Sequence, residues 1–349
     1  MKIRTLLVDS SYLLKRSVNG AKDAYTDEFG HIGGLYSFMV TLRKLIKEYK
    51  VNKVVLVWDG ENGGIYRYRI DNGYKANRKN KSWFVKIELT DAQIQEEQEK
   101  EESILKQRKR IQAYAEELFL RQIEVDEIEG DDLIAKYCID YNNKEEIFIF
   151  TNDRDFAQLL DLNITIIFSN IEKPINKKNF YYYFGYTYKN ALPMKIIEGD
   201  TSDNIPGISG LKEKTLFKYI PKFKTKPFTV REICKSADDL NKERIKNKKK
   251  PLKAFSNLLE NIDRLKINYK LINLRDPILN EEAIEELEQL VMPLSPEGRS
   301  SKNLLKMMKE DGFLKVYKGD FISFVEPFYT VIMSEKEKYK NYLTNRKKK

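Results

Sequence analysis

The stretch 147–155, IFIFTNDRD, decides the fold class of this chain. Its first four residues are apolar and predict a buried strand, and two aspartates follow that strand closely. Similar apolar runs at 3–8, 54–58 and 164–168 also predict strands. Helical patterns at 34–49 and 131–141 lie between them. This alternation predicts an α/β fold with a mostly parallel sheet covered by helices.

Acidic residues follow these predicted strands where each strand ends. Asp9 comes directly after the first strand and Asp59 after the second. Asp153 and Asp155 follow the strand at 147–150. The carboxyl ends of parallel strands lie at one edge of a sheet, so we expect these side chains to converge in one pocket. For any one of these positions, capping of the next helix is an equally good explanation.

Further acidic residues extend this predicted cluster. Glu129, Asp131 and Asp132 open a predicted helix, and Asp200 and Asp203 form a pair that could equally belong to a turn. Packed carboxylates repel one another unless a cation neutralises them, and oxygen ligands suit Mg²⁺ or Mn²⁺. Two such ions on a basic protein indicate phosphodiester hydrolysis, because one ion activates water while the other stabilises the leaving oxygen.

Composition narrows the possible partners and chemistry. The 349 residues include 63 Lys and Arg against 53 Asp and Glu, a net charge of +10. This favours an anionic partner such as nucleic acid, an acidic protein or a membrane surface. The single histidine, His31, excludes histidine triads and multi-histidine zinc sites. Two cysteines, Cys138 and Cys234, indicate a reducing compartment, and no apolar run is long enough for a transmembrane helix.

Three regions interrupt or follow the α/β pattern. Residues 75–122 hold a basic, aromatic segment and then a long polar helix, which is either a solvated helix with ion pairs along its face or a mobile arch. Residues 241–253 contain seven basic residues and one acidic residue, and we expect a mobile basic loop there. The expected domains are a catalytic domain at 1–178, a mostly helical subdomain at 179–276, and a helical C-terminal extension with a basic tail at 277–349.

Six motifs resemble those of the 5′-nuclease superfamily, which comprises flap endonucleases and 5′–3′ exonucleases with a PIN-like catalytic domain. Free-standing bacteriophage flap endonucleases and phage ribonuclease H-type enzymes are the most similar in organisation. In chain order the motifs are LLVD at 6–9, VVLVWDG at 54–60, GYKANRK at 73–79, EGDDLIA at 129–135, TNDRDFAQLL at 151–160 and GDTSDNIPGISGLKEKT at 199–215. The resemblance implies a PIN-like sheet with a helical arch and a helix-hairpin-helix DNA-binding subdomain.

The resemblance also implies roles for individual residues. The implied ligands of a first metal ion are Asp9, Asp59, Glu129 and Asp131. The implied ligands of a second ion are Asp132, Asp153, Asp155 and Asp203, with Asp200 close by. Lys75 and Arg78 would contact the scissile phosphate and stabilise transition-state charge, and Tyr74 could stack on a terminal base. Without the resemblance, both basic residues would be regarded as ordinary surface charges.

The implied DNA-binding element is a helix-hairpin-helix at 204–218. Gly207 and Gly210 would let backbone N–H groups approach duplex phosphates, and the basic residues Lys195 and Lys214 would also lie near the DNA. Lys212 stands where the family pattern has glycine, which makes a K⁺ site at this turn doubtful. We expect Lys212 either to replace that ion and reach the DNA or to point to solvent. The aromatic run at 181–184 is expected to pack in the core rather than stack on bases.

The predicted function is cleavage of phosphodiesters at or near 5′ ends, on flaps, nicked duplexes and RNA primers during replication. The expected cofactors are two Mg²⁺ or Mn²⁺ ions. A monomer in the cytoplasm of a bacterial or phage-infected cell would bind these DNA substrates and replication proteins such as a single-strand-binding protein or a clamp. The alternatives are a PIN-type ribonuclease for single-stranded RNA and a non-catalytic scaffold for duplex DNA. The helix-hairpin-helix favours a duplex partner, and a scaffold has no need to assemble carboxylates that repel one another.

Overall fold

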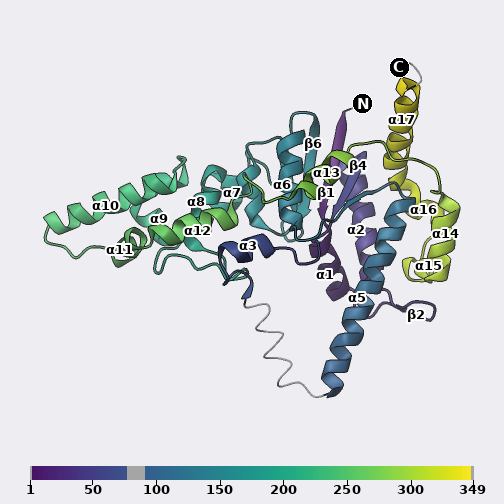
Figure 1. Ribbon diagram of the computed structural model, residues 1–349, viewed down its shortest axis with the longest axis horizontal. Helices are drawn as coiled ribbons and strands as arrows, with labels where there is room; N and C mark the ends of the chain where they lie inside the picture. Colours follow the sequence, from purple (N-terminus) through teal and green to yellow (C-terminus); the bar gives the residue numbers. More distant parts are fainter. Residues whose placement is uncertain (1, 77–90, 347–349) are drawn as a thin grey trace. The chain divides into compact units, whose positions relative to one another are not determined.

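The computed structural model describes residues 2–76 and 91–346, which divide into two compact units. Unit 1 consists of Met1–Gly63, Leu89–Asn152 and Leu279–Lys349, and unit 2 of Gly64–Glu88 and Asp153–Ile278. This division differs from the expected domains, because the C-terminal region packs within unit 1 instead of forming a separate extension. The chain passes more than once between the units, as the colours along the sequence show in Figure 1.

A parallel sheet forms the centre of unit 1. Strand β1 (Ile3–Asp9) pairs in parallel with β4 (Lys53–Val57) and with β6 (Glu145–Thr151), and β4 pairs in parallel with β5 (Arg121–Ile123). The apolar residues at the middle of β1 are completely buried, as expected for a strand covered on both faces. The predicted strands here are confirmed. Strand β5 was not predicted, because its sequence, RQI, is short and mostly polar.

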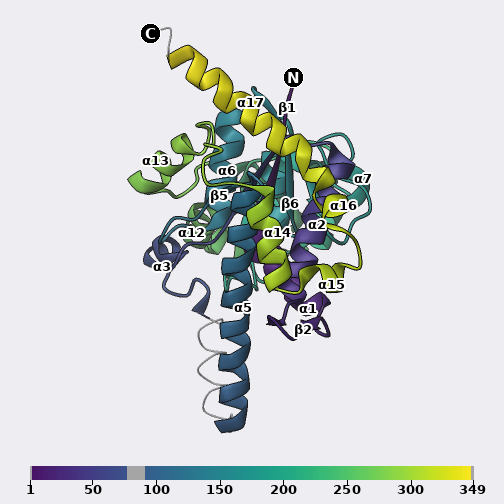
Figure 2. The same ribbon diagram turned by 90° about the vertical axis from the view of Figure 1, so that its right-hand side faces the viewer.

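Helices flank this sheet, as predicted (Figures 1 and 2). They are α1 (Ser10–Gly20), α2 (Gly33–Tyr49), α5 (Asp91–Glu117) and α6 (Gly130–Tyr141). A small antiparallel hairpin, β2 (Tyr25–Thr26) with β3 (Gly30–His31), precedes α2. Helix α2 can begin here only with glycine, because a Cβ on Gly33 would lie 1.9 Å from the carbonyl oxygen of Ala21.

The long polar helix α5 is docked along its C-terminal half. Gln107, Ile111 and Tyr114 are fully buried, whereas the described side chains at 98–102 are exposed. The side-chain oxygen of Gln107 accepts a hydrogen bond from the N–H of Leu35 at 3.0 Å, so α5 caps the N-terminus of α2. The C-terminal half is therefore buried and not a solvated face, the residues at 98–102 fit the solvated helix, and the mobile arch stays a prediction.

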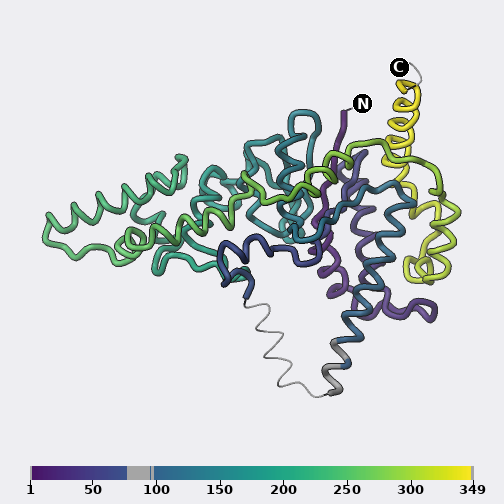
Figure 3. The backbone as a smooth tube through the Cα atoms, in the orientation of Figure 1, coloured from purple at the N-terminus to yellow at the C-terminus, as the bar shows by residue number. Residues whose placement is uncertain are grey.

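The C-terminal region of unit 1 packs against α5 and α2. Its elements are α13 (Glu281–Gln289), α14 (Ser301–Glu310), α15 (Phe313–Tyr317), α16 (Phe321–Val325), η4 (Glu326–Phe328) and α17 (Tyr329–Arg346). Helix α14 lies beside α5 in Figures 2 and 3. Buried Asp311 accepts hydrogen bonds from Arg110 and Tyr114 of α5, each at 2.6 Å. This region is therefore an integral part of the unit that contains the sheet.

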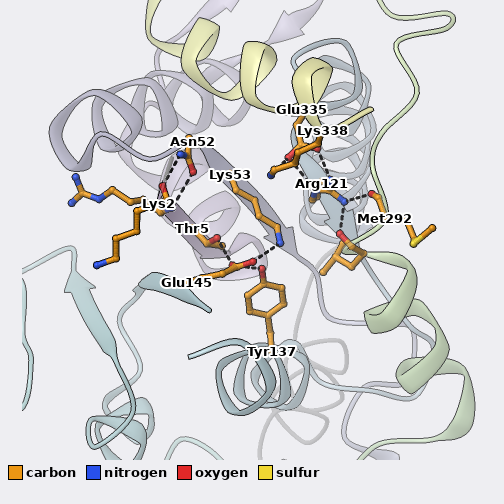
Figure 4. Close-up of polar contacts among 12 residues, drawn as sticks. Lys2, Thr5, Asn52, Lys53, Arg121, Tyr137, Glu145, Met292, Glu335 and Lys338 are labelled. Carbon is orange, nitrogen blue, oxygen red and sulfur yellow. Dashed lines mark hydrogen bonds and ion pairs between the residues drawn. The ribbon is translucent and has the colours of Figure 1, made fainter. Parts of the chain in front are cut away.

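Two buried ion pairs join elements of unit 1: one links two strands and the other links a strand to a C-terminal helix (Figure 4). Lys53 on β4 lies 3.0 Å from Glu145 on β6, and Glu145 also accepts hydrogen bonds from Thr5 and Tyr137. Arg121 on β5 pairs with Glu335 on α17, and both side chains are almost completely inaccessible to solvent.

Unit 2 is mostly helical. Its elements are α3 (Ile65–Ile70), η1 (Arg154–Leu159), β7 (Ile164–Phe168), α7 (Phe180–Phe184), η2 (Tyr188–Asn190), α8 (Ala191–Glu198), α9 (Glu213–Tyr219), η3 (Pro221–Lys224), α10 (Val230–Lys246), α11 (Lys253–Glu260) and α12 (Ile262–Ile272). Phe223, Phe255 and Leu258 are among the residues at the centre of its core. In the described part of the chain, no helix combines the length and apolar character needed to cross a bilayer.

Two expectations about unit 2 are wrong. The segment 241–253 is not a mobile loop, because α10 continues to Lys246, α11 begins at Lys253 and only six residues connect them. The aromatic run at 181–184 is not a core segment as a whole, since Tyr181 and Tyr182 are 49% and 84% exposed. Only Phe184 packs as expected, with its ring stacked on buried Phe180 at 4.5 Å between centroids.

Candidate active site

Carboxylates gather at the carboxyl ends of the strands in unit 1. Asp9 is the last residue of β1 and pairs in register with Val57 of β4, and Asp59 follows Val57 by two residues. One oxygen of Asp9 accepts from the N–H of Tyr12 at 2.9 Å, and the other accepts from the hydroxyl of Thr151 at 3.0 Å. The capping explanation is therefore correct for Asp9, but its second oxygen is held by a residue at the end of β6.

The N-terminus of α6 brings further acidic residues to the same edge. The N–H of Gly130 donates to Oδ1 of Asp59 at 2.9 Å. Glu129 immediately precedes this glycine, and Asp131 and Asp132 occupy the first turn of α6. Their charges lie near the positive end of the helix dipole, which stabilises them. The five ligands predicted in unit 1 thus lie at the ends of β1 and β4 and at the start of α6, and Glu129 and Asp132 are only 6% and 1% exposed.

Unit 2 has its own carboxylate cluster, which includes an ammonium group. Asp153 caps η1 by accepting from the N–H of Asp155 at 2.7 Å. Lys195 on α8 lies 2.9 Å from Asp155 and 2.7 Å from Asp200. Lys195 was expected near the DNA, but in this structure its ammonium is engaged by two carboxylates.

The two partners of Lys195 differ in their proton affinity. Burial and the neighbouring charge of Asp153 raise the pKa of Asp155 to about 7, although Lys195 opposes this shift. Burial also acts on Asp200, but hydrogen bonds from Lys195 and Ser202 outweigh it and hold the pKa of Asp200 below its usual range. Of these two carboxylates, Asp155 is therefore the one whose ionised form depends more on a nearby cation.

Two of the sequence motifs meet within unit 2. The N–H of Lys75 donates to the carbonyl oxygen of Asp203 at 2.8 Å, and the side-chain amide of Asn204 donates to the carbonyl oxygen of Gly73 at 2.7 Å. Lys75 and Asn204 both have left-handed backbones, with φ of 53° and 56°. Such conformations are uncommon outside glycine and persist where surrounding contacts fix them. The predicted catalytic lysine is thus attached to the loop that carries Asp203.

Tyr74 is buried beside this lysine. It is only 6% exposed, and it belongs to a cluster with Ile205, Leu271 and Ile272. Its hydroxyl donates to Oδ2 of Asp203 at 3.4 Å. A base can stack only on an accessible ring, so this position does not support the expected stacking role. Tyr74 instead anchors the backbone next to Lys75.

The predicted hairpin connects α8 to α9. Gly207 passes close to α8, because a Cβ on it would lie 2.0 Å from the carbonyl oxygen of Glu198. Gly210 has a φ of +77°, which favours glycine. Lys212 has an extended backbone with φ of −121°, a conformation that any residue can adopt without strain. Its ammonium donates to the carbonyl oxygen of Glu198 at 2.8 Å, while Lys214 lies exposed in the first turn of α9.

The chemistry of the donors suits a hard divalent cation. Every predicted ligand is a carboxylate, the group that Mg²⁺ and Mn²⁺ prefer. Among residues 2–76 and 91–346, no three His, Cys, Asp or Glu side chains are already arranged as a metal-binding group. Arg78, the second predicted catalytic residue, lies outside the described residues.

Two supporting residues, Thr151 and Asn204, were not predicted from the sequence. Thr151 fixes Asp9, and Asn204 fixes the backbone before Lys75. Both lie inside the sequence motifs and next to or near an aspartate. Searching the motifs for polar residues next to the carboxylates would have identified both residues.

Comparison with known proteins agrees with this fold and with the predicted class, a 5′ nuclease. Residues 4–185 match the family described as 5′-3′ exonuclease, N-terminal resolvase-like domain, and the chain belongs to this family. A 5′-3′ exonuclease of Mycoplasmopsis pulmonis is 27% identical over 81% of this chain and 89% of its own length. One of Halalkalibacterium halodurans is 30% identical over 63% of this chain and 70% of its own length.

Solved structures share the predicted fold. The T5 5′-exonuclease with bound zinc superposes with a TM-score of 0.64 at 19% identity, over 87% of this chain and 99% of its own. This similarity confirms the PIN-like α/β class predicted from the motifs.

Proposed function

We propose that this nuclease hydrolyses phosphodiesters at or near the 5′ ends of duplex DNA, including 5′ flaps, nicks and RNA primers, during replication. The observation that carries the proposal is the set of carboxylates at the strand ends of unit 1, where Asp9 ends β1, Asp59 accepts from the N–H of Gly130 and Glu129 immediately precedes α6. The solved complex of the T5 D15 flap endonuclease with DNA and metal ions, which has a TM-score of 0.63 and 18% identity to this chain, is consistent with a DNA substrate.

Divalent cations, Mg²⁺ or Mn²⁺, are the proposed cofactors. In unit 1 their ligands would be Asp9, Asp59, Glu129, Asp131 and Asp132, and in unit 2 they would be Asp153, Asp155, Asp200 and Asp203. Bound there, two ions would supply an activated water and stabilise the leaving oxygen. The T5 5′-exonuclease was solved with divalent zinc, which supports divalent ions as the class of cofactor.

The chain's own residues position these groups. Thr151 and the N–H of Tyr12 orient Asp9, and the N–H of Gly130 orients Asp59. Lys75 would bind the scissile phosphate through its ammonium, with its backbone fixed by Asp203. Arg78 is proposed to assist in the same role.

A cleavage assay on three labelled substrates tests this proposal. We expect Mg²⁺-dependent release of the 5′ product from a 5′-flap duplex and from a nicked duplex with an RNA 5′ end. Single-stranded RNA of the same sequence should remain largely intact, and EDTA should stop the reaction. Preferential cleavage of the single-stranded RNA would instead indicate a PIN-type ribonuclease. Tight duplex binding without cleavage under any divalent ion would indicate a scaffold.

A further inference from the structure

The connection between α10 and α11 is a fixed hairpin. The side chain of buried Asn241 accepts a hydrogen bond from the N–H of Leu252 at 2.8 Å and donates to Ser256 at 3.3 Å. The guanidinium of Arg244 donates to the carbonyl oxygen of Lys250 at 2.9 Å, and the N–H of Lys249 donates to the carbonyl oxygen of Arg244 at 2.8 Å. The backbone that carries the lysines at this end of the hairpin is therefore ordered before any partner binds.

These lysines carry exposed charge that no described carboxylate neutralises. We define the basic tip as the exposed residues Lys246, Lys248, Lys249, Lys250 and Lys253. Within the described parts of the chain, none of them forms an ion pair with an acidic residue. Lys242, one turn earlier on α10, does pair with Asp238 at 2.6 Å. The tip thus lacks the kind of acidic partner that Lys242 has, which is unfavourable for folding and favourable for binding an anion.

Helix α11 connects this tip directly to the predicted phosphate-binding loop. The side-chain amide of Asn257 donates to the carbonyl oxygen of Ser209 at 3.0 Å, and a Cβ on Gly210 would lie 3.5 Å from that of Ala254. Lys253 of the tip immediately precedes Ala254, and a helix rises about 1.5 Å per residue. Lys253 at the tip is therefore adjacent in sequence to the residue of α11 that lies against the loop 207–210.

We propose that the basic tip is a second contact surface for the phosphate backbone of duplex DNA, continuing the surface that starts at the loop 207–210. The inference rests on the proposed function, since it assumes that the loop grips a duplex. Lysine ammonium groups bind phosphates without reading sequence, so the tip would add affinity and lengthen the bound duplex rather than select a base sequence.

Salt titrations of binding test the proposal. The variant Lys248→Ala/Lys249→Ala/Lys250→Ala is compared with the wild-type chain on a 5′-flap duplex in EDTA, so that cleavage plays no part. The slope of log affinity against log salt should become shallower by about 0.9 for each phosphate that the variant no longer neutralises, or up to about 2.7 in total. Shortening the duplex by steps should weaken wild-type binding until it equals that of the variant on the full-length duplex.

A matched control separates local contact from overall charge. The variant Lys173→Ala/Lys177→Ala/Lys178→Ala removes the same charge from exposed residues elsewhere in unit 2, and we expect an unchanged slope. If the two triple variants change the slope equally, or if the tip variant leaves it unchanged, the inference is wrong. Cleavage of flaps by the wild-type chain would show that the proposed function still holds in that case. A wild-type chain that neither binds nor cleaves the flap duplex overturns the proposed function itself.

Discussion

Asp59 follows β4 with one of its oxygens already held by the N–H of Gly130. Asparagine keeps an oxygen in that place, so Asp59→Asn should fold normally but lose the charge that a divalent ion requires. We expect cleavage of a 5′ flap to fall at least about 100-fold, with duplex affinity nearly unchanged, because phosphate contacts elsewhere supply the binding. The measurements are single-turnover cleavage at saturating Mg²⁺ and duplex binding in EDTA.

Asp126 provides the matched control for this experiment. It is an exposed acidic residue close in sequence to Glu129 but outside the cluster, and Asp126→Asn should retain wild-type cleavage. Near-normal turnover by Asp59→Asn at saturating Mg²⁺ would remove Asp59 from the set of proposed ligands. A parallel loss in the Asp126 variant would point to general charge and not to metal binding.

Arg121 and Glu335 form a buried pair whose members depend on each other. Arg121 also donates to the carbonyl oxygens of Leu290 and Met292, the latter at 2.7 Å. Glu335→Ala leaves the guanidinium charged and uncompensated, so the free energy of unfolding should fall by about 3–5 kcal/mol. Lys338→Ala removes only a partly exposed neighbour of Glu335 and should cost less than about 1 kcal/mol.

Urea unfolding measures both changes, and a double variant sharpens the comparison. Replacing both members, as in Arg121→Met/Glu335→Leu, removes the uncompensated charge and should restore part of the stability despite the carbonyl groups left without a donor. A single Glu335→Ala variant as stable as the wild-type chain would show that the pair contributes nothing to stability.

Glu145 makes the same unit sensitive to acid. Burial opposes the shift, but the charge of Lys53 and the hydrogen bonds from Thr5 and Tyr137 hold the pKa of Glu145 below its usual value of 4.5. A carboxyl with a lowered pKa binds fewer protons when folded, so its contribution is complete above about pH 4.5 and is lost as the pH falls through the folded pKa. We expect the urea midpoint to fall less steeply below pH 4.5 in Glu145→Gln than in the wild-type chain.

At the scale of elements, apolar runs located the strands well but could not define their ends. Strand β6 extends from Glu145 to Thr151, beyond the four apolar residues that predicted it, because parallel pairing with β1 continues past them. The connection between α10 and α11 shows that charge patterns can also predict a loop where the chain is ordered. Its charged sequence indicated a loop, but long-range contacts such as Asn241 with Leu252 order it, and periodicity does not report such contacts.

The site residues that lie at strand ends could be predicted from the sequence. Asp9 ends β1 and Asp59 follows β4 closely, so the strand ends predict both positions, whereas the pairing of Lys195 with Asp155 and Asp200 depends on how α8 packs against η1. The burial of Tyr74 was likewise not predictable from its neighbours in the chain. That burial arises from contacts with residues some 200 positions later, among them Leu271.

The turn between α8 and α9 makes a prediction about monovalent ions. The ammonium of Lys212 already donates to the Glu198 carbonyl oxygen, a group that could otherwise face a mobile cation. Duplex binding by the wild-type chain should therefore hardly change when K⁺ replaces Na⁺ at constant ionic strength. Lys212→Gly should introduce a preference for K⁺ and weaken binding when K⁺ is low.

Titrations in matched NaCl and KCl decide between the two roles of Lys212. A clear K⁺ preference in the wild-type chain, or a glycine variant with undiminished affinity, would contradict the substitution of an ion by lysine. Lys214→Ala serves as the comparison, because it removes an equal charge from the first turn of α9 while the hydrogen bond from Lys212 to Glu198 remains. This variant should weaken binding equally in both salts.

At the scale of the whole molecule, the sheet unit is completed by residues far along the chain. A chain that stops at Ile278 lacks Asp311, the partner of Arg110 and Tyr114, and also lacks Glu335. We expect hydrogen exchange in β1 and β4 to accelerate strongly in this truncated chain, while α8 and α11 of unit 2 retain their protection. A chain that stops at Arg346 is the control and should exchange like the full-length protein.

Arg121 precedes its buried partner Glu335 by 214 residues. At about 5–20 residues per second, the ribosome needs roughly 10–40 s to make that interval. Once Asp203 has been made, the nascent chain carries the sheet residues and every proposed metal ligand, but Arg121 still has no counter-charge in its final position. The sheet unit therefore reaches full stability only late in its own synthesis, so a ribosome stalled before Glu335 would hold an incompletely folded nuclease.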